Sequence, residues 1–406
     1  MMRLGRLAVL AALVSLGAGC AAAGTPAARG GQGRTPIVEV LPNGLTLIVQ
    51  DHRAADIVAA YLWVATGVRY ETPETLGHAH FQEHMLFKGT NTFGPGYIDR
   101  TVEGTGGRSN AFTSFDYTTF QILVPSEATA TAIQLLDAMA FRSTFDPKQV
   151  AAEGEVISEE ARIETDTPKS GIIRQLYGLV FGPHPYGRPV LGTQATRSAA
   201  TQDNLKAFNH RFYTPENMAL VVVGPIEAKA VRAMVDRTFG KRPRTGYTPP
   251  AVPSLVPIAG VVRRTVERPE QQAYLALGWQ APSAADRDSL SLDLLATILG
   301  GSESSRLVTT LRDGERIVTR VSVDNSTQQL AGMIYVYAQL EAGDVDKAER
   351  RILKLIAEKK TSREIGAELF ISPRTVEAHR ANICAKLELT GSHSLLQFAL
   401  ENRSAI

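Results

Sequence analysis

The stretch GHAHFQEHMLFKGT, residues 77–90, carries the motif on which the predicted function depends. Its histidines His80 and His84 are four positions apart, so on a helix their side chains project from one face, one turn apart. Glu83 lies between them on that face. The opposite face is apolar, which favours a helix packed against a core, through Phe81, Met85 and Leu86.

This spacing predicts a metal centre. Zinc in a hydrolase needs three protein ligands, an open position for water and a nearby carboxylate that accepts the water's proton. His80 and His84 can supply two ligands and Glu83 the base, so the third ligand has to come from elsewhere. Because the chain has only two cysteines, the metal must rely on histidine and carboxylate ligands. His78 should face away from the metal, either supporting the ligands or lying on the surface.

Composition indicates a globular protein of two to four domains. The 406 residues are 44% hydrophobic, and 43 Lys plus Arg against 41 Asp plus Glu leave a net charge of +2. This balance excludes wholesale disorder and a uniformly polycationic protein. Strand and helix patterns alternate from Pro36 onward, so we predict an α+β fold. The expected strands are 37–40, 45–49, 57–65, 120–124 and 219–223, with a hairpin turn at 42–44 and helices at 129–141 and 203–212.

The proline-rich segment Lys241–Pro257 has neither a helical nor a strand period, which is typical of a linker. Beyond it, a strand at 273–279 and a helix at 289–299 repeat the order of 59–64 and 78–87. The sequence therefore predicts two related halves joined by this linker.

The inverted order His-x-x-Glu-His resembles the motif of the insulinase and pitrilysin family of zinc peptidases, which includes mitochondrial processing peptidase. Other stretches are similar to the same family: GVRYE at 67–71, HPYG at 184–187 and YTPEN at 213–217. The resemblance covers about residues 37–344. It implies metal-assisted peptide hydrolysis with one Zn²⁺ per chain.

The resemblance also implies the remaining site residues. The family's third zinc ligand falls on Glu160 and its auxiliary acidic residue on Glu153, both within EGEVISEE at 153–160. Glu159 remains the alternative ligand, because a one-residue shift of the alignment would exchange the two. Asn110, Ala111, Phe112 and Thr113 match the edge strand that pairs with substrate, which favours extended peptides.

In this family two α+β halves enclose a chamber, either within one long chain or between two shorter chains. The resemblance thus implies a catalytic domain at 37–240, the linker at 241–257 and a truncated, non-catalytic second domain at 258–344. A chain with one motif-bearing and one motif-free half should pair with a second copy of itself or with a sister non-catalytic subunit.

The N-terminal residues 1–20 have the layout of an export signal, with Arg3 and Arg6 before an apolar run that is too short to remain as a membrane anchor. LGAGC at 16–20 resembles a bacterial lipoprotein cleavage box, in which Cys20 would be lipidated. Plain secretion and an uncleaved tether are the alternatives. Residues 21–36 would form a flexible tether, and the protein is expected to be anchored in a membrane facing the periplasm.

The C-terminal residues 345–406 follow another pattern. Three predicted helices, at 348–357, 361–369 and 374–387, form a helix-turn-helix layout, and SPRTVEAHR at 372–380 resembles the LuxR-type DNA-binding domain over about 345–402. The third helix would enter the major groove. Thr375, Val376 and His379 would lie near base edges, with Arg374, Arg380 and Lys386 on phosphates and Cys384 packed inside.

These two resemblances conflict, because an exported chain has no DNA to bind. We interpret Glu341–Lys347 as the junction between unrelated segments. The leading hypothesis is an exported zinc endopeptidase. The alternatives are a cytoplasmic DNA-binding regulator with a non-catalytic peptidase-like half, and a non-catalytic partner subunit, which would usually lack the intact motif.

Overall fold

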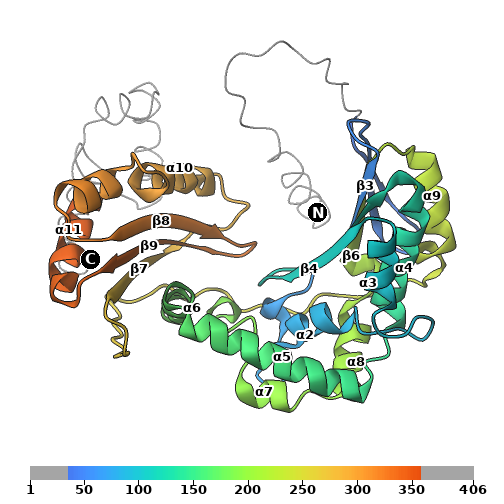
Figure 1. Ribbon diagram of the computed structural model, residues 1–406, viewed down its shortest axis with the longest axis horizontal. Helices are drawn as coiled ribbons and strands as arrows, with labels where there is room; N and C mark the ends of the chain where they lie inside the picture. The colour runs from blue at the N-terminus through green and yellow to red at the C-terminus, as the bar shows by residue number, and fades with distance from the viewer. Residues whose placement is uncertain (1–34, 358–406) are drawn as a thin grey trace, which may run out of the picture. The chain divides into compact units, whose positions relative to one another are not determined.

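The computed structural model describes residues 35–357, which divide into two compact units (Figure 1). Residues 35–167 and 183–254 form the first unit, and residues 168–182 and 255–357 form the second. Within these residues, no helix is both long enough and apolar enough to cross a membrane.

The first unit is built on a six-stranded sheet with the order β1-β2-β6-β3-β5-β4. Only β2 and β6 pair in parallel; the other neighbours are antiparallel. The expected hairpin at 42–44 is present between β1 and β2. The strands are β1 (Ile37–Val40), β2 (Thr46–Asp51), β3 (Ile57–Val64), β4 (Arg108–Thr113), β5 (Thr118–Pro125) and β6 (Met218–Gly224).

Helices cover one face of this sheet (Figure 1). The reason is visible in β3, where burial alternates along the strand and Val58, Ala60, Leu62 and Val64 enter the core. The helices are α2 (His78–Met85), α3 (Tyr97–Gly104), α4 (Thr129–Arg142), α5 (Pro147–Asp166), α7 (Gln194–Ser198), α8 (Gln202–Phe212) and α9 (Ala228–Arg237). Short 3₁₀ turns are η1 (Val68–Tyr70), η2 (Ser126–Ala128), η3 (Pro185–Gly187), η4 (Pro215–Asn217) and η5 (Phe239–Lys241).

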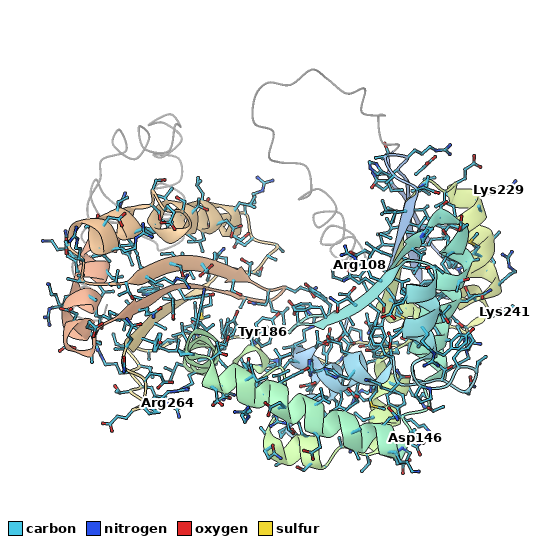
Figure 2. The ribbon with its side chains drawn as sticks, in the orientation of Figure 1. Arg108, Asp146, Tyr186, Lys229, Lys241 and Arg264 are labelled. Carbon is cyan, nitrogen blue, oxygen red and sulfur yellow. The ribbon has the colours of Figure 1, made fainter. Side chains whose placement is uncertain are left out.

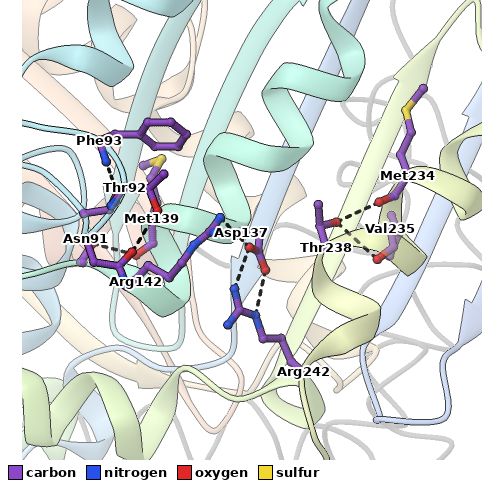
Figure 3. Close-up of polar contacts among 12 residues, drawn as sticks. Asn91, Thr92, Phe93, Asp137, Met139, Arg142, Met234, Val235, Thr238 and Arg242 are labelled. Atoms are coloured by element: carbon purple, nitrogen blue, oxygen red, sulfur yellow. Dashed lines mark hydrogen bonds and ion pairs between the residues drawn. The ribbon is translucent and has the colours of Figure 1, made fainter.

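A buried carboxylate ties the start of the linker to this unit (Figure 3). Asp137 on α4 is 2% exposed and accepts from Arg142 on the same helix at 2.9 Å. Arg242 donates to both of its oxygens, at 3.0 and 2.8 Å. Because a bidentate guanidinium–carboxylate pair fixes orientation as well as distance, residue 242 is held against α4. The rest of the expected linker, through residue 257, has neither helix nor strand.

The second unit is a three-stranded antiparallel sheet with the order β7-β9-β8. Its elements are α6 (Pro168–Phe181), β7 (Ala273–Ala281), α10 (Asp288–Gly300), the π-helix η6 (Val308–Gly314), β8 (Arg320–Thr327), β9 (Gly332–Leu340), η7 (Ala342–Asp344) and α11 (Val345–Ala357). Helix α6 packs closely on β7, because a Cβ at Gly278 would lie 3.0 Å from side-chain carbons of Leu176 and Val180.

The two units share a topology, as expected for related halves. In the first, the order is β3, η1, α2, α3, β4, β5, η2 and α4, with pairing β3-β5-β4. In the second, the order is β7, α10, η6, β8, β9, η7 and α11, with pairing β7-β9-β8, so the shared strands, first helix and last helix come in the same order. The mixed α and β composition agrees with the predicted class.

Two helices differ from the expected domain boundaries. Helix α6 lies within the range predicted for the catalytic domain, yet it belongs to the second unit. Helix α11 begins where the helix-turn-helix domain was expected, but its apolar residues Ala348, Ile352 and Leu355 are buried in the core of the second unit. The order of elements along the sequence does not reveal which sheet a helix covers.

Candidate metal centre

Helix α2 carries the sequence motif, and a buried carboxylate fixes where it begins. Gly77, the N-cap residue that precedes α2, adopts a left-handed conformation with φ +87°, and a Cβ there would lie 2.9 Å from the backbone of Gly192. Glu71, 3% exposed, accepts from the backbone N–H groups of Gly77 at 2.9 Å and Ala79 at 2.8 Å. Two of the N–H groups that a helix start leaves unpaired are thereby satisfied.

The apolar face of α2 packs into the core of the first unit, as the sequence predicted. Phe81 and Met85 are 1% exposed. Gln82 fixes the rotation of the helix, because its amide donates to the carbonyl of Leu205 at 2.9 Å and accepts from Asn209 at 3.1 Å, both on α8. The opposite face of α2, with the motif histidines, is thereby directed toward α5.

Helix α5 brings the third acidic group to this face. Its first turn is capped by Asp146, which is labelled in Figure 2 and accepts from the backbone N–H groups of Lys148 and Gln149. Oε2 of Glu160 lies 3.7 Å from Nε2 of His80 and 3.5 Å from Nε2 of His84. One ligand atom from each of these three residues lies within 4.8 Å of the other two.

The donor set fits zinc. At metal–ligand distances of about 2.0–2.2 Å, tetrahedral ligand atoms lie about 3.3–3.6 Å apart, close to the separations between Glu160 and the two imidazoles. Burial and the neighbouring His84 lower the pKa of His80 to about 3, so His80 is neutral near pH 7 and has a lone pair to offer. The Glu160 side chain is 41% exposed, which leaves solvent access to the group.

The other acidic candidates occupy different positions. Oε2 of Glu153 lies 3.0 Å from Nδ1 of His84, on the side of the ring away from Glu160. This contact can fix the tautomer that leaves Nε2 free to bind a metal. Glu159 instead pairs with Arg162 at 2.6 Å, and its side chain is 54% exposed. The structure therefore groups Glu160, and not Glu159, with the histidines.

Glu83 lies beside the three-residue group in an environment suited to proton transfer. Its carboxylate is 3.8 Å from Nε2 of His80 and its side chain is 17% exposed. Burial raises the pKa of Glu83, although hydrogen bonds from Thr113 and the charge of His84 oppose the rise. A carboxylate with a raised pKa is a better proton acceptor near neutral pH than an exposed one.

Strand β4 forms one edge of the sheet beside this group, as the sequence predicted. Ser109, Ala111 and Thr113 face the helices, and the hydroxyl of Thr113 donates to the carbonyl of Ala79 on α2 at 3.5 Å. Asn110 and Phe112 project from the other face, where Phe112 is 55% exposed. An open strand edge can pair with an extended peptide.

Sequence reasoning missed several supporting residues. Glu71 belongs to the GVRYE stretch that resembles the family, but the sequence alone does not show that its carboxylate accepts hydrogen bonds from the start of α2. His78, for which a surface position was one of two expectations, is 1% exposed and packs edge-on against Phe208. Burial lowers the pKa of His78 to about 4, so this ring is neutral at pH 7.

The remaining predicted sites lie outside the described residues. These are the lipidation site Cys20 and the DNA-contacting residues Arg374, Thr375, Val376, His379, Arg380 and Lys386.

Comparison with known proteins identifies the family. Residues 46–194 match the family model "Insulinase (Peptidase family M16)", and residues 199–370 match "Peptidase M16 inactive domain". The chain is 31% identical over 350 residues to "Uncharacterized zinc protease YmxG" of Bacillus subtilis, covering 86% of this chain and 84% of that protein. The chain belongs to the M16 peptidase family. Zinc is the metal that this family implies.

Other relatives and solved structures agree. A Rickettsia bellii "Uncharacterized zinc protease" is 29% identical, covering 87% of this chain and 83% of that protein. A protease from Helicobacter pylori matches the fold with a TM-score of 0.77 at 22% identity, covering 91% of this chain and 90% of that one. The "peptidase M16 inactive domain" from Pseudomonas fluorescens matches with a TM-score of 0.76 at 18% identity, with the same coverage.

A third family model overlaps the end of the M16 match. Residues 347–399 match "Bacterial regulatory proteins, luxR family". The overlap, residues 347–370, includes most of α11, which packs in the second M16 unit. Residues 358–399 of this match lie outside the described residues.

Proposed function

We propose that this chain is a zinc-dependent endopeptidase of extended peptides, with one Zn²⁺ per chain held by His80, His84 and Glu160. The observation that carries the proposal is the grouping of two imidazoles and a carboxylate, from α2 and α5, at distances a single zinc ion can bridge. Zinc bound there would activate a water molecule and polarise the scissile carbonyl.

The protein's own groups then have separate tasks. Glu83 takes the proton of the attacking water and delivers it to the leaving amine. Substrate lies along β4 as an added strand, held by main-chain hydrogen bonds beside Asn110, Ala111, Phe112 and Thr113. Thr113 connects the two regions, because it ends β4 and also hydrogen-bonds to Glu83.

Substituting Glu83 tests whether this residue is needed for peptide cleavage but not for zinc binding. Glu83→Gln should retain zinc but lose peptide cleavage by about 10²–10⁴-fold in kcat, measured with a quenched fluorescent peptide library. Glu103→Gln, an exposed position on α3, serves as the matched control. Removing zinc with a chelator should abolish wild-type cleavage, and adding zinc back should restore it. Equal cleavage by Glu83→Gln and wild type would remove Glu83 from the mechanism.

We further propose that the catalytic half works with a second copy of the chain or with a sister non-catalytic subunit. The match of residues 199–370 to the family's inactive domain supports this division of labour. Analytical ultracentrifugation of the zinc-loaded protein tests it, because a strictly monomeric, fully active protein would contradict it.

The ends of the chain carry two further proposals. An export signal at 1–20 with lipidation of Cys20 would anchor the peptidase in a membrane facing the periplasm. Membrane fractionation of wild type and Cys20→Ser tests this, since only the variant should become soluble. A cytoplasmic, unprocessed chain would contradict the proposal.

DNA binding by the C-terminal segment is the second candidate function, favoured by the LuxR family match at 347–399. Gel retardation of genomic DNA fragments by wild type and by Arg380→Ala tests it. Retardation that Arg380→Ala weakens would favour a regulator. No retardation by wild type at low salt would eliminate it.

A further inference from the structure

A lysine connects the end of the motif helix to the acidic residue beside His84. Lys88 lies three positions after Met85, the last residue of α2, and its backbone N–H donates to the carbonyl of Met85 at 3.0 Å. Its ammonium Nζ lies 2.8 Å from Oε1 of Glu153. Oε2 of the same carboxylate lies 3.0 Å from Nδ1 of His84. Each oxygen of the Glu153 carboxylate therefore has its own partner, Lys88 for Oε1 and His84 for Oε2.

The contacts among Lys88, Glu153 and His84 differ from a surface ion pair because Glu153 is buried. The Glu153 side chain is 8% exposed, whereas that of Lys88 is 36% exposed. A carboxylate removed from water is costly unless a counter-charge and hydrogen bonds compensate it. When His84 is a neutral ligand, it offers Glu153 a hydrogen bond but no charge, so the ammonium of Lys88 has to supply the compensation.

The Glu153 carboxylate also orients the imidazole ring of His84. A metal-binding imidazole must present Nε2 to the ion, which requires the proton on Nδ1 and the ring turned correctly. Glu153 accepts at Nδ1 of His84 only while its carboxylate plane keeps one oxygen toward the ring. Lys88 lies 2.8 Å from the other oxygen, so it restricts rotation of the carboxylate.

The two histidines differ in this respect. Nδ1 of His80 is buried and has no hydrogen-bond partner among the described residues. His84 is therefore the ligand whose ring is oriented by a side chain from another helix. Any group that steadies Glu153 acts on the metal centre through His84.

We propose that Lys88 is a positioning residue of the metal centre, whose ammonium holds the Glu153 carboxylate in the orientation that aligns His84 for zinc. The inference rests on the proposed function, because it assumes that zinc binds at His80, His84 and Glu160. Lys88 is not one of the three proposed zinc ligands, and it acts on the site through Glu153 and His84.

Zinc affinity of the metal-free protein tests the assignment directly. Lys88→Met keeps the apolar stem and removes the charge, Lys88→Arg keeps the charge, and Lys148→Met makes the same change at an exposed lysine on α5. In chelator competition we expect Lys88→Met to bind zinc about 10-fold more weakly than wild type. Lys88→Arg should recover most of this loss, and Lys148→Met should match wild type.

A double substitution at Lys88 and Glu153 shows whether Lys88 acts on zinc binding through Glu153 or by destabilising the fold. Adding Lys88→Met to Glu153→Gln should weaken zinc binding by less than about 2-fold, because the group that Lys88 holds is already altered. At saturating zinc, Lys88→Met should lower kcat and leave KM nearly unchanged.

Three outcomes would overturn the inference. One is a Lys88→Met protein that binds zinc as tightly as wild type. Another is a full 10-fold loss on adding Lys88→Met to Glu153→Gln. The third is wild-type protein without measurable zinc affinity, which would remove the proposed function as well.

Discussion

Oε2 of Glu160 lies 3.5 Å from Nε2 of His84, although Glu160 belongs to α5 and His84 to α2. The centre therefore depends on the packing of two helices and not on one motif. Both helices are fixed independently, α2 by Glu71 and Gln82 and α5 by Asp146 at its first turn. The ligands are thus brought together by the fold of the first unit.

Substitutions at Glu160 and Glu159 distinguish which of the two residues binds zinc. Glu160→Gln should lose zinc, because one of three ligands is weakened. Glu159→Gln should keep zinc at the wild-type level, since Glu159 faces Arg162. Inductively coupled plasma mass spectrometry on the purified variants measures both. Zinc loss in Glu159→Gln alone would exchange the two assignments.

The start of α2 should depend on Glu71. Glu71→Ala leaves two helical N–H groups without their acceptor, and we expect it to lower the free energy of unfolding by about 2–4 kcal/mol. Glu74→Ala changes an exposed residue of the same loop and should cost less than about 0.5 kcal/mol. Urea denaturation of the zinc-free proteins gives both values. Equal stability of the two variants would contradict the role of Glu71.

Proline scanning of β4 tests the substrate edge. Successive N–H groups of a strand point alternately toward its neighbour and away from it. Of Asn110→Pro and Ala111→Pro, one should therefore disturb pairing with β5 and destabilise the fold. The other should remove an outward N–H group, leaving the fold intact and raising KM for peptides. Unchanged KM in whichever variant remains folded would argue against substrate pairing at β4.

The contact between Glu216 and the linker should respond to acid. Burial acts to raise the pKa of Glu216, but hydrogen bonds from the backbone of Glu216, Gly246 and Thr245 outweigh it and lower the pKa below the usual 4.5. A lowered folded pKa means that this contact is complete above about pH 4.5 and is lost as the pH falls through the folded pKa.

Amide chemical shifts of Thr245 and Gly246 measure this directly by nuclear magnetic resonance. They should titrate with a midpoint below 4.5, and Glu216→Gln should abolish the transition. A midpoint above 4.5 in wild type would contradict the predicted direction.

Much of the first unit could be predicted from local pattern. The strands at 37–40 and 57–65, the hairpin at 42–44 and the helix at 129–141 are encoded by nearby residues, and the structure confirms them within a few positions. The zinc motif is equally local, because His80, Glu83 and His84 share one helical turn. Glu160 could be predicted as a ligand only from the spacing of the ligands in the similar family, since nothing near Glu160 in the sequence indicates a metal.

What the sequence could not provide depends on contacts between distant segments. Glu71 and Lys88 act on groups that their own neighbourhoods do not specify. Helix α6 is followed in the chain by elements of the first unit but covers β7. The sequence of helix α11 is also compatible with the start of a helix-turn-helix domain, and the burial of Ala348, Ile352 and Leu355 assigns the helix to the second unit.

Anomalous diffraction at the zinc absorption edge, from crystals of the zinc-loaded protein, shows whether His80, His84 and Glu160 hold one zinc ion. We expect one strong peak per chain, about 2.0–2.2 Å from Nε2 of His80, Nε2 of His84 and a carboxylate oxygen of Glu160. A peak bound by other residues, or no peak in protein that cleaves peptides, would contradict it.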